Sequence, residues 1–279
     1  MATLSLASPA LAHEAGAPFS GAITDLLALH HAHLENEQRL NGYVARGIEG
    51  PLGEKRTGYE SELELAWASE DFKLGAEFFI PLLRIPSAVP GQEESGIGDV
   101  EIRPIKYAFV NRPDFIVSTA TGIVLPTGDK NQGLGEGNTT LSQLLFLDKA
   151  YGNWFAGFNL GADRRVKGDD GRGVEYGMAL SYSFIRGTAA GEVASPVPAQ
   201  QLVLAPSVEL IGEQRYGGPD DGEHAVSLLP GLTLWWPHSG WQFRVGVMLP
   251  QSGEKEADRT YLVQIGNHFN WGTLLGRRD

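Results

Sequence analysis

The sequence predicts an all-β fold, a transmembrane antiparallel β-barrel of about 12 strands. Segments in which polar and apolar residues alternate recur along the whole chain, and a strand with lipid on one face and a polar bore on the other must alternate in this way. Short turns flanked by aromatic residues also alternate with longer connections rich in glycine and acidic residues. Tight turns on one rim and long loops on the other are typical of membrane barrels.

Alternation is clearest in six segments: residues 62–67, 72–80, 154–163, 174–184, 202–210 and 241–249. In the first of these, Leu63, Leu65 and Trp67 would face lipid, and Glu62 and Glu64 the bore. Weaker alternation predicts further strands at residues 97–109, 114–126, 139–150, 224–236 and 261–269, and the least regular candidate is 33–46. About twelve strands is an even number, which places both chain ends on the same side of the barrel.

The connections sort into two sets. The long ones are residues 47–56, 82–96, 127–138, 167–172, 216–222 and 251–258, and the short ones fall between them, except that residues 187–199 are too long for a tight turn. Aromatic residues flank the short turns, as expected where rings bridge hydrocarbon and lipid headgroups. The predicted aromatic girdle consists of Trp67, Phe72, Phe109, Phe115, Tyr151, Trp154, Trp235 and Trp241.

Composition excludes several classes of protein. The chain has no cysteine, which excludes disulfides, thiolate catalysis and cysteine-bound metals. A net charge of -12 is unsuited to nucleic acid, because few clustered cations are present to neutralise phosphates. No dinucleotide fingerprint, Walker motif or nucleophile elbow occurs, and the pair His238 and Ser239 has no carboxylate nearby in the sequence. The sequence therefore predicts no cofactor and no enzymatic activity.

The chain divides into four parts. Residues 1–12 resemble a residual signal peptide, because Ala10-Leu11-Ala12 has the form of a signal-peptidase site although no basic leader precedes it. A periplasmic N-terminal arm is expected at residues 13–34, the barrel at 35–269 and a tail at 270–279. The arm contains helical spacing at Ile23, Leu26, Leu27 and His30. Two alternatives follow: a short helix that plugs the bore or lies at its periplasmic mouth, or an unstructured leader.

The middle of the chain carries a more specific pattern: Gly96-Ile97-Gly98-Asp99, Lys106-Tyr107, Leu125-Pro126-Thr127-Gly128-Asp129, Gly133-Leu134-Gly135-Glu136-Gly137 and Asn159-Leu160-Gly161. This pattern resembles the outer-membrane transporter family named for the meta-cleavage pathway of phenol degradation, most clearly over residues 96–163. The C-terminus departs from it, because such barrels usually end on an aromatic residue and here a tail follows Phe269. The resemblance implies passage of small, aromatic or hydrophobic molecules across the bacterial outer membrane.

Charged and polar residues on the inner faces form the predicted lining of the bore: Glu62, Glu64, Lys73, Glu77, Asp99, Glu101, Arg103, Asp163, Glu175, Glu209, Arg244 and Gln264. Mixed charge in a narrow bore favours ion pairs across it, since an unpaired buried charge is costly. A polar path that selects permeants by charge is the alternative.

Histidines cluster near the start of the chain. His13, His30, His31 and His33 are candidate metal ligands for copper or zinc, because neutral imidazole binds both. His13 would be the first residue after cleavage at Ala12. The alternative is a polar arm without metal.

These observations predict a channel or porin-like transporter for passive passage of small molecules, in contact with outer-membrane lipid and lipopolysaccharide and not with nucleic acid. Two alternatives are a closed structural or adhesive barrel and a metal-linked outer-membrane protein. The permeant and the oligomeric state stay open.

Overall fold

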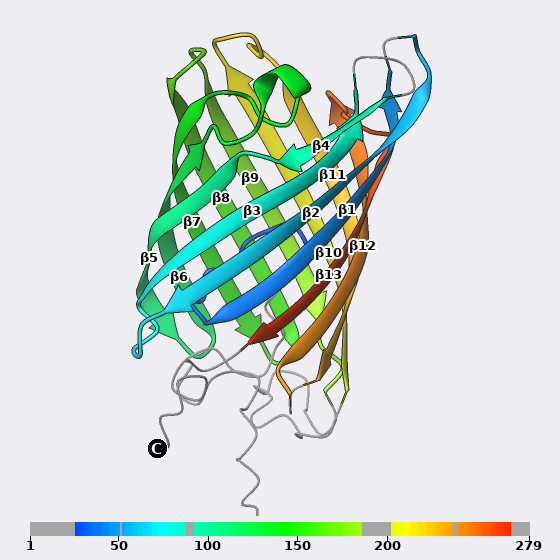
Figure 1. Cartoon of the computed structure of the whole chain (residues 1–279). Helices are drawn as coiled ribbons and strands as arrows, with labels where there is room; N and C mark the ends of the chain where they lie inside the picture. Colours follow the sequence, from blue (N-terminus) through cyan, green and yellow to red (C-terminus); the bar gives the residue numbers. More distant parts are fainter. Residues whose placement is uncertain (1–25, 51, 88–91, 186–201, 237–238, 269–279) are drawn as a thin grey trace, which may run out of the picture.

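The computed structural model describes residues 26–50, 52–87, 92–185, 202–236 and 239–268, which form a closed antiparallel β-barrel (Figure 1). Neighbouring strands follow one another in the chain, and pairing of β1 with β13 closes the cylinder. The strands are β1 (Glu37–Glu49), β2 (Lys55–Ala68), β3 (Leu74–Pro86), β4 (Glu93–Ile97), β5 (Val100–Arg112), β6 (Phe115–Leu125), β7 (Thr139–Tyr151), β8 (Trp154–Lys167), β9 (Arg172–Tyr182), β10 (Val203–Tyr216), β11 (His224–Trp236), β12 (Trp241–Gly253) and β13 (Arg259–His268).

The thirteen strands occupy twelve positions around the barrel. The short β4 pairs with residues 82–86 of β3, and β5 pairs with residues 74–79 of the same strand. β4 and β5 are therefore one strand position interrupted at Gly98 and Asp99. The Asp99 carboxylate accepts hydrogen bonds from the backbone of Gly128 and Glu136, which ties the interruption to the loop after β6. The predicted all-β barrel of about twelve strands is confirmed.

The two rims differ as expected. One rim, called here the short-turn rim, carries the two-residue turns between β5 and β6 and between β7 and β8. Glu37 pairs with His268 at this rim, so both ends of the barrel lie there. The opposite, long-loop rim carries the connection of residues 126–138, which contains the 3₁₀ helix η1 (Lys130–Gln132). The long connection predicted at residues 187–199 lies outside the described residues.

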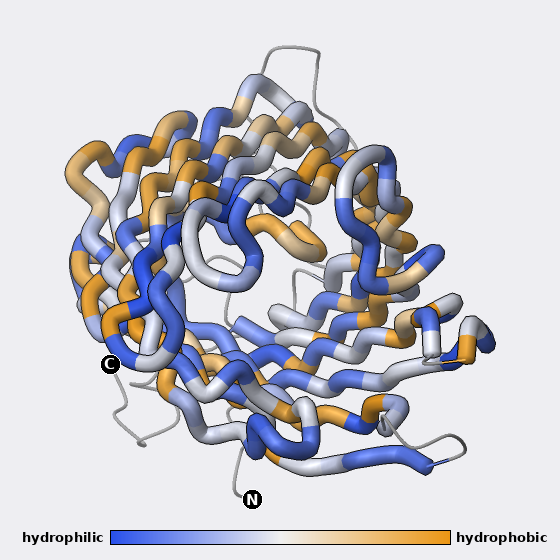
Figure 2. Tube along the Cα trace, turned by 90° about the horizontal axis from the view of Figure 1, so that it is seen from above, coloured by the Kyte–Doolittle hydropathy of each residue, from blue (hydrophilic) through white to orange (hydrophobic). Residues whose placement is uncertain are grey.

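Side chains alternate across the wall as predicted, with apolar groups on the outside. Leu63, Leu65 and Trp67 are exposed, and the intervening Glu64 and Ala66 are buried. Figure 2 shows the same alternation of hydrophobic and hydrophilic residues around the ring of strands. The described residues include no helix long and apolar enough to span a membrane.

The predicted position on the outer face is wrong for two members of the aromatic girdle, Phe72 and Trp235. Phe72 lies in the turn after β2 with φ 51 and is buried against the interior of the barrel. Trp235 is buried beside Val203 and Ala205, and it is the next residue, Trp236, that is exposed. Phe72 differs because β3 begins only at Leu74, so the alternation of that strand does not extend to it. At Trp235 and Trp236 two adjacent aromatic residues leave the facing ambiguous by one position, and a shift of one residue moves a side chain to the other face.

Candidate functional site

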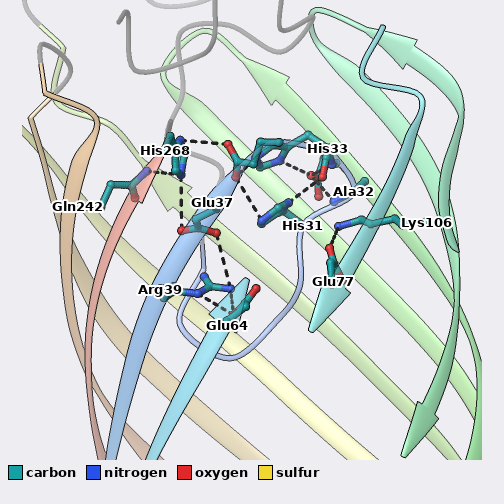
Figure 3. A network of polar contacts seen from close by, with 12 residues as sticks. His31, Ala32, His33, Glu37, Arg39, Glu64, Glu77, Lys106, Gln242 and His268 are labelled. Carbon is teal, nitrogen blue, oxygen red and sulfur yellow. Dashed lines mark hydrogen bonds and ion pairs between the residues drawn. The ribbon is translucent and has the colours of Figure 1, made fainter. Parts of the chain in front are cut away.

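Residues 26–36, called here the plug segment, lie inside the barrel and not beside it. Leu26, Leu27, Ala32 and Leu34 of this segment are buried. Figure 2 shows a hydrophobic stretch of chain inside the ring of strands, and Figure 3 shows the segment looping through the interior before it enters β1. The segment contains bends and no helix. The alternative of a short helix is therefore wrong for residues 26–36. The arm expected at residues 13–34 therefore occupies the bore from residue 26 onward.

The first anchor of the plug segment is a carboxylate on β10. Glu209 accepts hydrogen bonds from three consecutive backbone N–H groups, those of Leu27 at 2.7 Å, Ala28 at 3.0 Å and Leu29 at 2.9 Å. Gln264 on β13 donates to the carbonyl of Leu27. Buried backbone groups need such partners wherever no strand or helix supplies them. Glu209 and Gln264 thus fix a non-regular stretch of chain in the interior.

Glycines of the inner wall make room for the leucines of the plug segment. A Cβ added at Gly177 on β9 would stand 2.1 Å from Leu29, and one added at Gly231 on β11 would stand 2.3 Å from Leu27. Gly75 on β3 likewise leaves space for Leu34. Because real Cβ atoms do not approach so closely, the wall and the plug segment have complementary shapes.

The second anchor lies on β7. Asp148, which is fully buried, accepts hydrogen bonds from the backbone of Ala32 at 2.6 Å and of His33 at 3.4 Å. Asn36 accepts one from the backbone of Ala68 at the end of β2. The plug segment is therefore held on opposite sides of the bore, by β10 and β13 in one half and by β2 and β7 in the other.

Three histidines and a glutamate meet where the plug segment joins β1 (Figure 3). His33 Nε2 lies 2.8 Å and His31 Nε2 3.4 Å from Oε1 of Glu35, and the two rings stack at 3.7 Å. His268 Nδ1, from the end of β13, lies 3.0 Å from the other oxygen of Glu35. All four side chains are buried.

Buried ion pairs lie along the wall beside the plug segment, where they join neighbouring or next-neighbouring strands and do not cross the bore as the sequence had suggested. One oxygen of Glu77 accepts a hydrogen bond from Lys106 Nζ at 2.6 Å, and the other accepts one from Arg103 Nη1 at 3.2 Å. Arg39 donates from Nε to Glu64 at 2.8 Å, and Arg244 Nη2 lies 3.3 Å from Glu37. Each charge has a partner of opposite sign, as buried charges require.

A charged vestibule opens toward the long-loop rim. It is a cavity of about 570 Å³ lined by Glu60, Asp99, Glu101, Arg103, Glu136, Asp163, Arg165, Glu175, Arg215 and Glu256, among others. Arg215 pairs with Asp163 at 3.0 Å and Arg165 with Asp220 at 2.7 Å. Acidic groups outnumber basic ones in this set. A smaller, more apolar cavity of about 100 Å³ lies beside the plug segment, lined by Leu29, His30, Leu144, Phe146, Tyr176 and Ile211 among others.

The predicted lining residues fall into two groups in the structure. Glu64, Glu77, Arg103, Glu209, Arg244 and Gln264 are buried around the plug segment. Asp99, Glu101, Asp163 and Glu175 line the vestibule. Glu62 is half-buried and accepts a hydrogen bond from Asn41. Lys73 departs from the prediction, because it is exposed in the turn between β2 and β3.

Of the four histidines predicted as metal ligands, the structure brings only two of those it describes together. His31 and His33 come together, but His30 lies elsewhere, against Arg103 at 3.0 Å and the Phe79 ring, and His13 lies outside the described residues. Sequence reasoning missed Glu35, Asp148 and His268 as neighbours of the histidines. The spacing His31-x-His33-x-Glu35 is the signal that could have found Glu35, whereas Asp148 and His268 join only through barrel closure.

Comparison with known proteins agrees with the barrel. An outer membrane channel from Pseudomonas putida F1 matches with a TM-score of 0.59 and 18% identity, over 88% of this chain and 99% of that one. The KdgM porin matches with a TM-score of 0.51 and 9% identity, over 84% and 99%. The beta domain of the Bordetella autotransporter BrkA matches at 0.50 and 11%, over 84% and 100%. None of the curated proteins is significantly similar to the chain.

At these identities the solved structures establish the fold alone, that of barrels of the bacterial outer membrane. The apolar outer face and charged interior of the described strands fit that location. The family model described as "Putative MetA-pathway of phenol degradation" matches residues 59–195, which include the segment that carried the resemblance in the sequence. Residues 59–195 therefore match this family, and the barrel as a whole has the fold of the outer-membrane proteins named above.

Proposed function

We propose that the protein is a narrow outer-membrane channel for passive passage of small molecules, and that it catalyses no reaction. The observation that carries the proposal is the closed barrel whose interior opens into a charged cavity of about 570 Å³. Outer-membrane barrels place short turns in the periplasm and long loops outside. The vestibule then faces the exterior, and the plug segment and both barrel ends lie toward the periplasm.

The permeants that fit best are small aromatic molecules. The cavity of about 100 Å³ beside the plug segment is lined by Leu29, Phe146 and Tyr176 among others. An apolar cavity of about 150 Å³ can hold a single benzene ring, so an aromatic ring would fit here after a small outward shift of the lining side chains. The family description names phenol degradation, which is consistent with this size and chemistry. The acidic vestibule would disfavour anions, because like charges raise the energy of entry.

Liposome swelling tests the proposal. Vesicles that contain the purified full chain should swell in phenol or catechol faster than protein-free vesicles, and faster than the same vesicles in a disaccharide or in benzoate. Rates equal to those of protein-free vesicles for every solute would refute passage. Protein-free vesicles must be measured with each solute, since phenols also cross bilayers unaided.

The alternative is a closed barrel whose long loops bind a partner, or bind lipopolysaccharide through divalent cations. The plug segment favours this alternative, because it crosses the bore and is held by Glu209 and Asp148. Planar-bilayer recording separates the two: steady open steps support a channel, and silence from protein shown to be folded supports the closed barrel.

A further inference from the structure

We propose that His31, His33 and Glu35 form a binding site for one divalent transition-metal ion, with Zn²⁺ as the reference ion, at the junction of the plug segment and the barrel. One ligand atom from each of the three residues lies within 4.8 Å of the others. All three side chains are buried. The site goes beyond passage of small molecules and does not depend on it.

The distances suit a single ion. Tetrahedral zinc with bonds of about 2.0–2.1 Å holds its ligand atoms about 3.3 Å apart. Glu35 Oε1 lies 3.4 Å from His31 Nε2 and 2.8 Å from His33 Nε2, and one ligand atom of each residue lies within 4.8 Å of the others. The two rings, which are stacked here, would turn toward a common centre when an ion binds. Two imidazoles and one carboxylate are also a recurrent ligand set of zinc sites that keep a fourth position open.

The histidine tautomers favour a metal. His31 Nδ1 lies 2.9 Å from the carbonyl oxygen of His33, and since a carbonyl only accepts, Nδ1 carries a proton. Nε2, the nitrogen that faces Glu35, is then the atom that takes up either a metal ion or a second proton. His33 Nδ1 lies 3.5 Å from the buried Asp148 carboxylate. Histidine ligands of metals commonly have a carbonyl or carboxylate at the second ring nitrogen in this way.

Electrostatics also favour a cation here. Glu35, Asp148 and Glu37 bring three carboxylates to this small buried region, and Arg244 Nη2 lies 3.3 Å and Arg39 Nη2 4.0 Å from Glu37. Carboxylates so close together attract positive charge, and a proton or a metal ion at His31, His33 and Glu35 would supply it. A metal ion does so with three ligands at once.

The site would couple metal to the plug segment. All three ligands belong to that segment, and the wall contributes Asp148 of β7, beside His33, and His268 of β13, beside the second oxygen of Glu35. A bound ion would hold the ligands in the conformation that meets Asp148 and His268 and so stabilise the plugged arrangement, since a ligand that binds only one state favours it.

Isothermal calorimetry on the full chain, folded in detergent and without a histidine tag, tests the site. Zn²⁺ should bind with a stoichiometry of one and a dissociation constant below about 1 μM, and Mg²⁺ should not compete, because imidazole ligands do not suit it. His33→Ala and Glu35→Gln should each weaken binding by at least about 100-fold, above the range of losses measured for outer-sphere partners. His224→Ala is the matched control, because His224 is exposed at the start of β11, and it should bind as the wild type does.

Co²⁺ absorption keeps the test decisive if a variant folds poorly. The wild-type protein with Co²⁺ should show the intense visible bands of a four- or five-coordinate site, and heat-modifiable gel mobility reports barrel folding separately. The proposal is overturned if folded wild-type protein binds Zn²⁺ with a dissociation constant above about 1 μM or does not bind it, in which case a proton alone balances the cluster. It is also overturned if binding is lost in His13→Ala and kept in His33→Ala.

Discussion

Glu77 lies between two cations in the interior of the barrel. Lys106 and Arg103 each contact one of its oxygens, and all three residues are buried. Removal of one partner from a buried ion pair typically costs about 3–5 kcal/mol, because the other charge stays buried without compensation. We therefore expect Glu77→Gln to lower the free energy of unfolding by that amount, measured by urea titration of the folded barrel in detergent.

The control is Asp114→Asn in the turn after β5. Lys149 donates a hydrogen bond to Asp114 and thereby holds the pKa of that carboxyl below its usual value, so the pair is charged at neutral pH. Both groups are exposed, and exposed pairs contribute little to stability. If Asp114→Asn destabilises the barrel as much as Glu77→Gln, the importance assigned to burial is wrong.

Trp235 and Trp236 test the facing of β11. Trp235 is 2% exposed and packs with Val203 and Ala205, whereas Trp236 is 41% exposed on the outer face. Truncation of a buried aromatic residue costs about 3–5 kcal/mol. Trp235→Ala should therefore destabilise the barrel by about that amount and Trp236→Ala by clearly less. Equal losses, or a larger loss at Trp236, would contradict the register of this strand.

At the scale of elements, the plug segment depends on the glycines that face it. Gly177→Val on β9 would place side-chain atoms where Leu29 packs, and overpacking costs about 1–3 kcal/mol. We expect the plug segment to leave its seat at least about fivefold more often, since 1.4 kcal/mol corresponds to about tenfold.

A single cysteine at Ala28 reports this change, because the chain has no cysteine of its own. Its reaction rate with a water-soluble maleimide should rise at least about fivefold in Gly177→Val, given the same energy range. Gly42→Val is the control: Gly42 lies on β1, and a Cβ there meets no atom closer than 3.6 Å. An unchanged rate in Gly177→Val would mean that the plug segment is not seated on β9.

Much of the barrel wall could be predicted from the sequence, but little could be predicted of the segment that fills the bore. Alternation in residues 62–67 determines the facing of Leu63 and Glu64, because strand geometry is local. The place of the plug segment depends instead on contacts such as Glu209 with Leu27 and Asp148 with Ala32, each more than 100 residues apart in the chain. Alternation predicts that Glu209 faces inward, but it cannot predict that the carboxylate meets backbone N–H groups.

At the scale of the whole molecule, the interior has two compartments. The vestibule near the long-loop rim is open and charged, and the part below it is occupied by the plug segment, whose leucines pack with Phe146, Phe155 and other residues of the inner wall. Passage through the barrel must therefore go past the plug segment or require its displacement. Conductance is expected to be small in the wild type and to rise when the segment is removed.

Single-channel recording in planar bilayers, comparing the full chain with a variant that lacks residues 26–34, is the most direct test. Both proteins should show the heat-modifiable mobility of a folded barrel. We expect steady steps of low conductance from the full chain and clearly larger steps from the deletion variant. Equal conductance would contradict a plug in the bore, and silence from both folded proteins would contradict a channel.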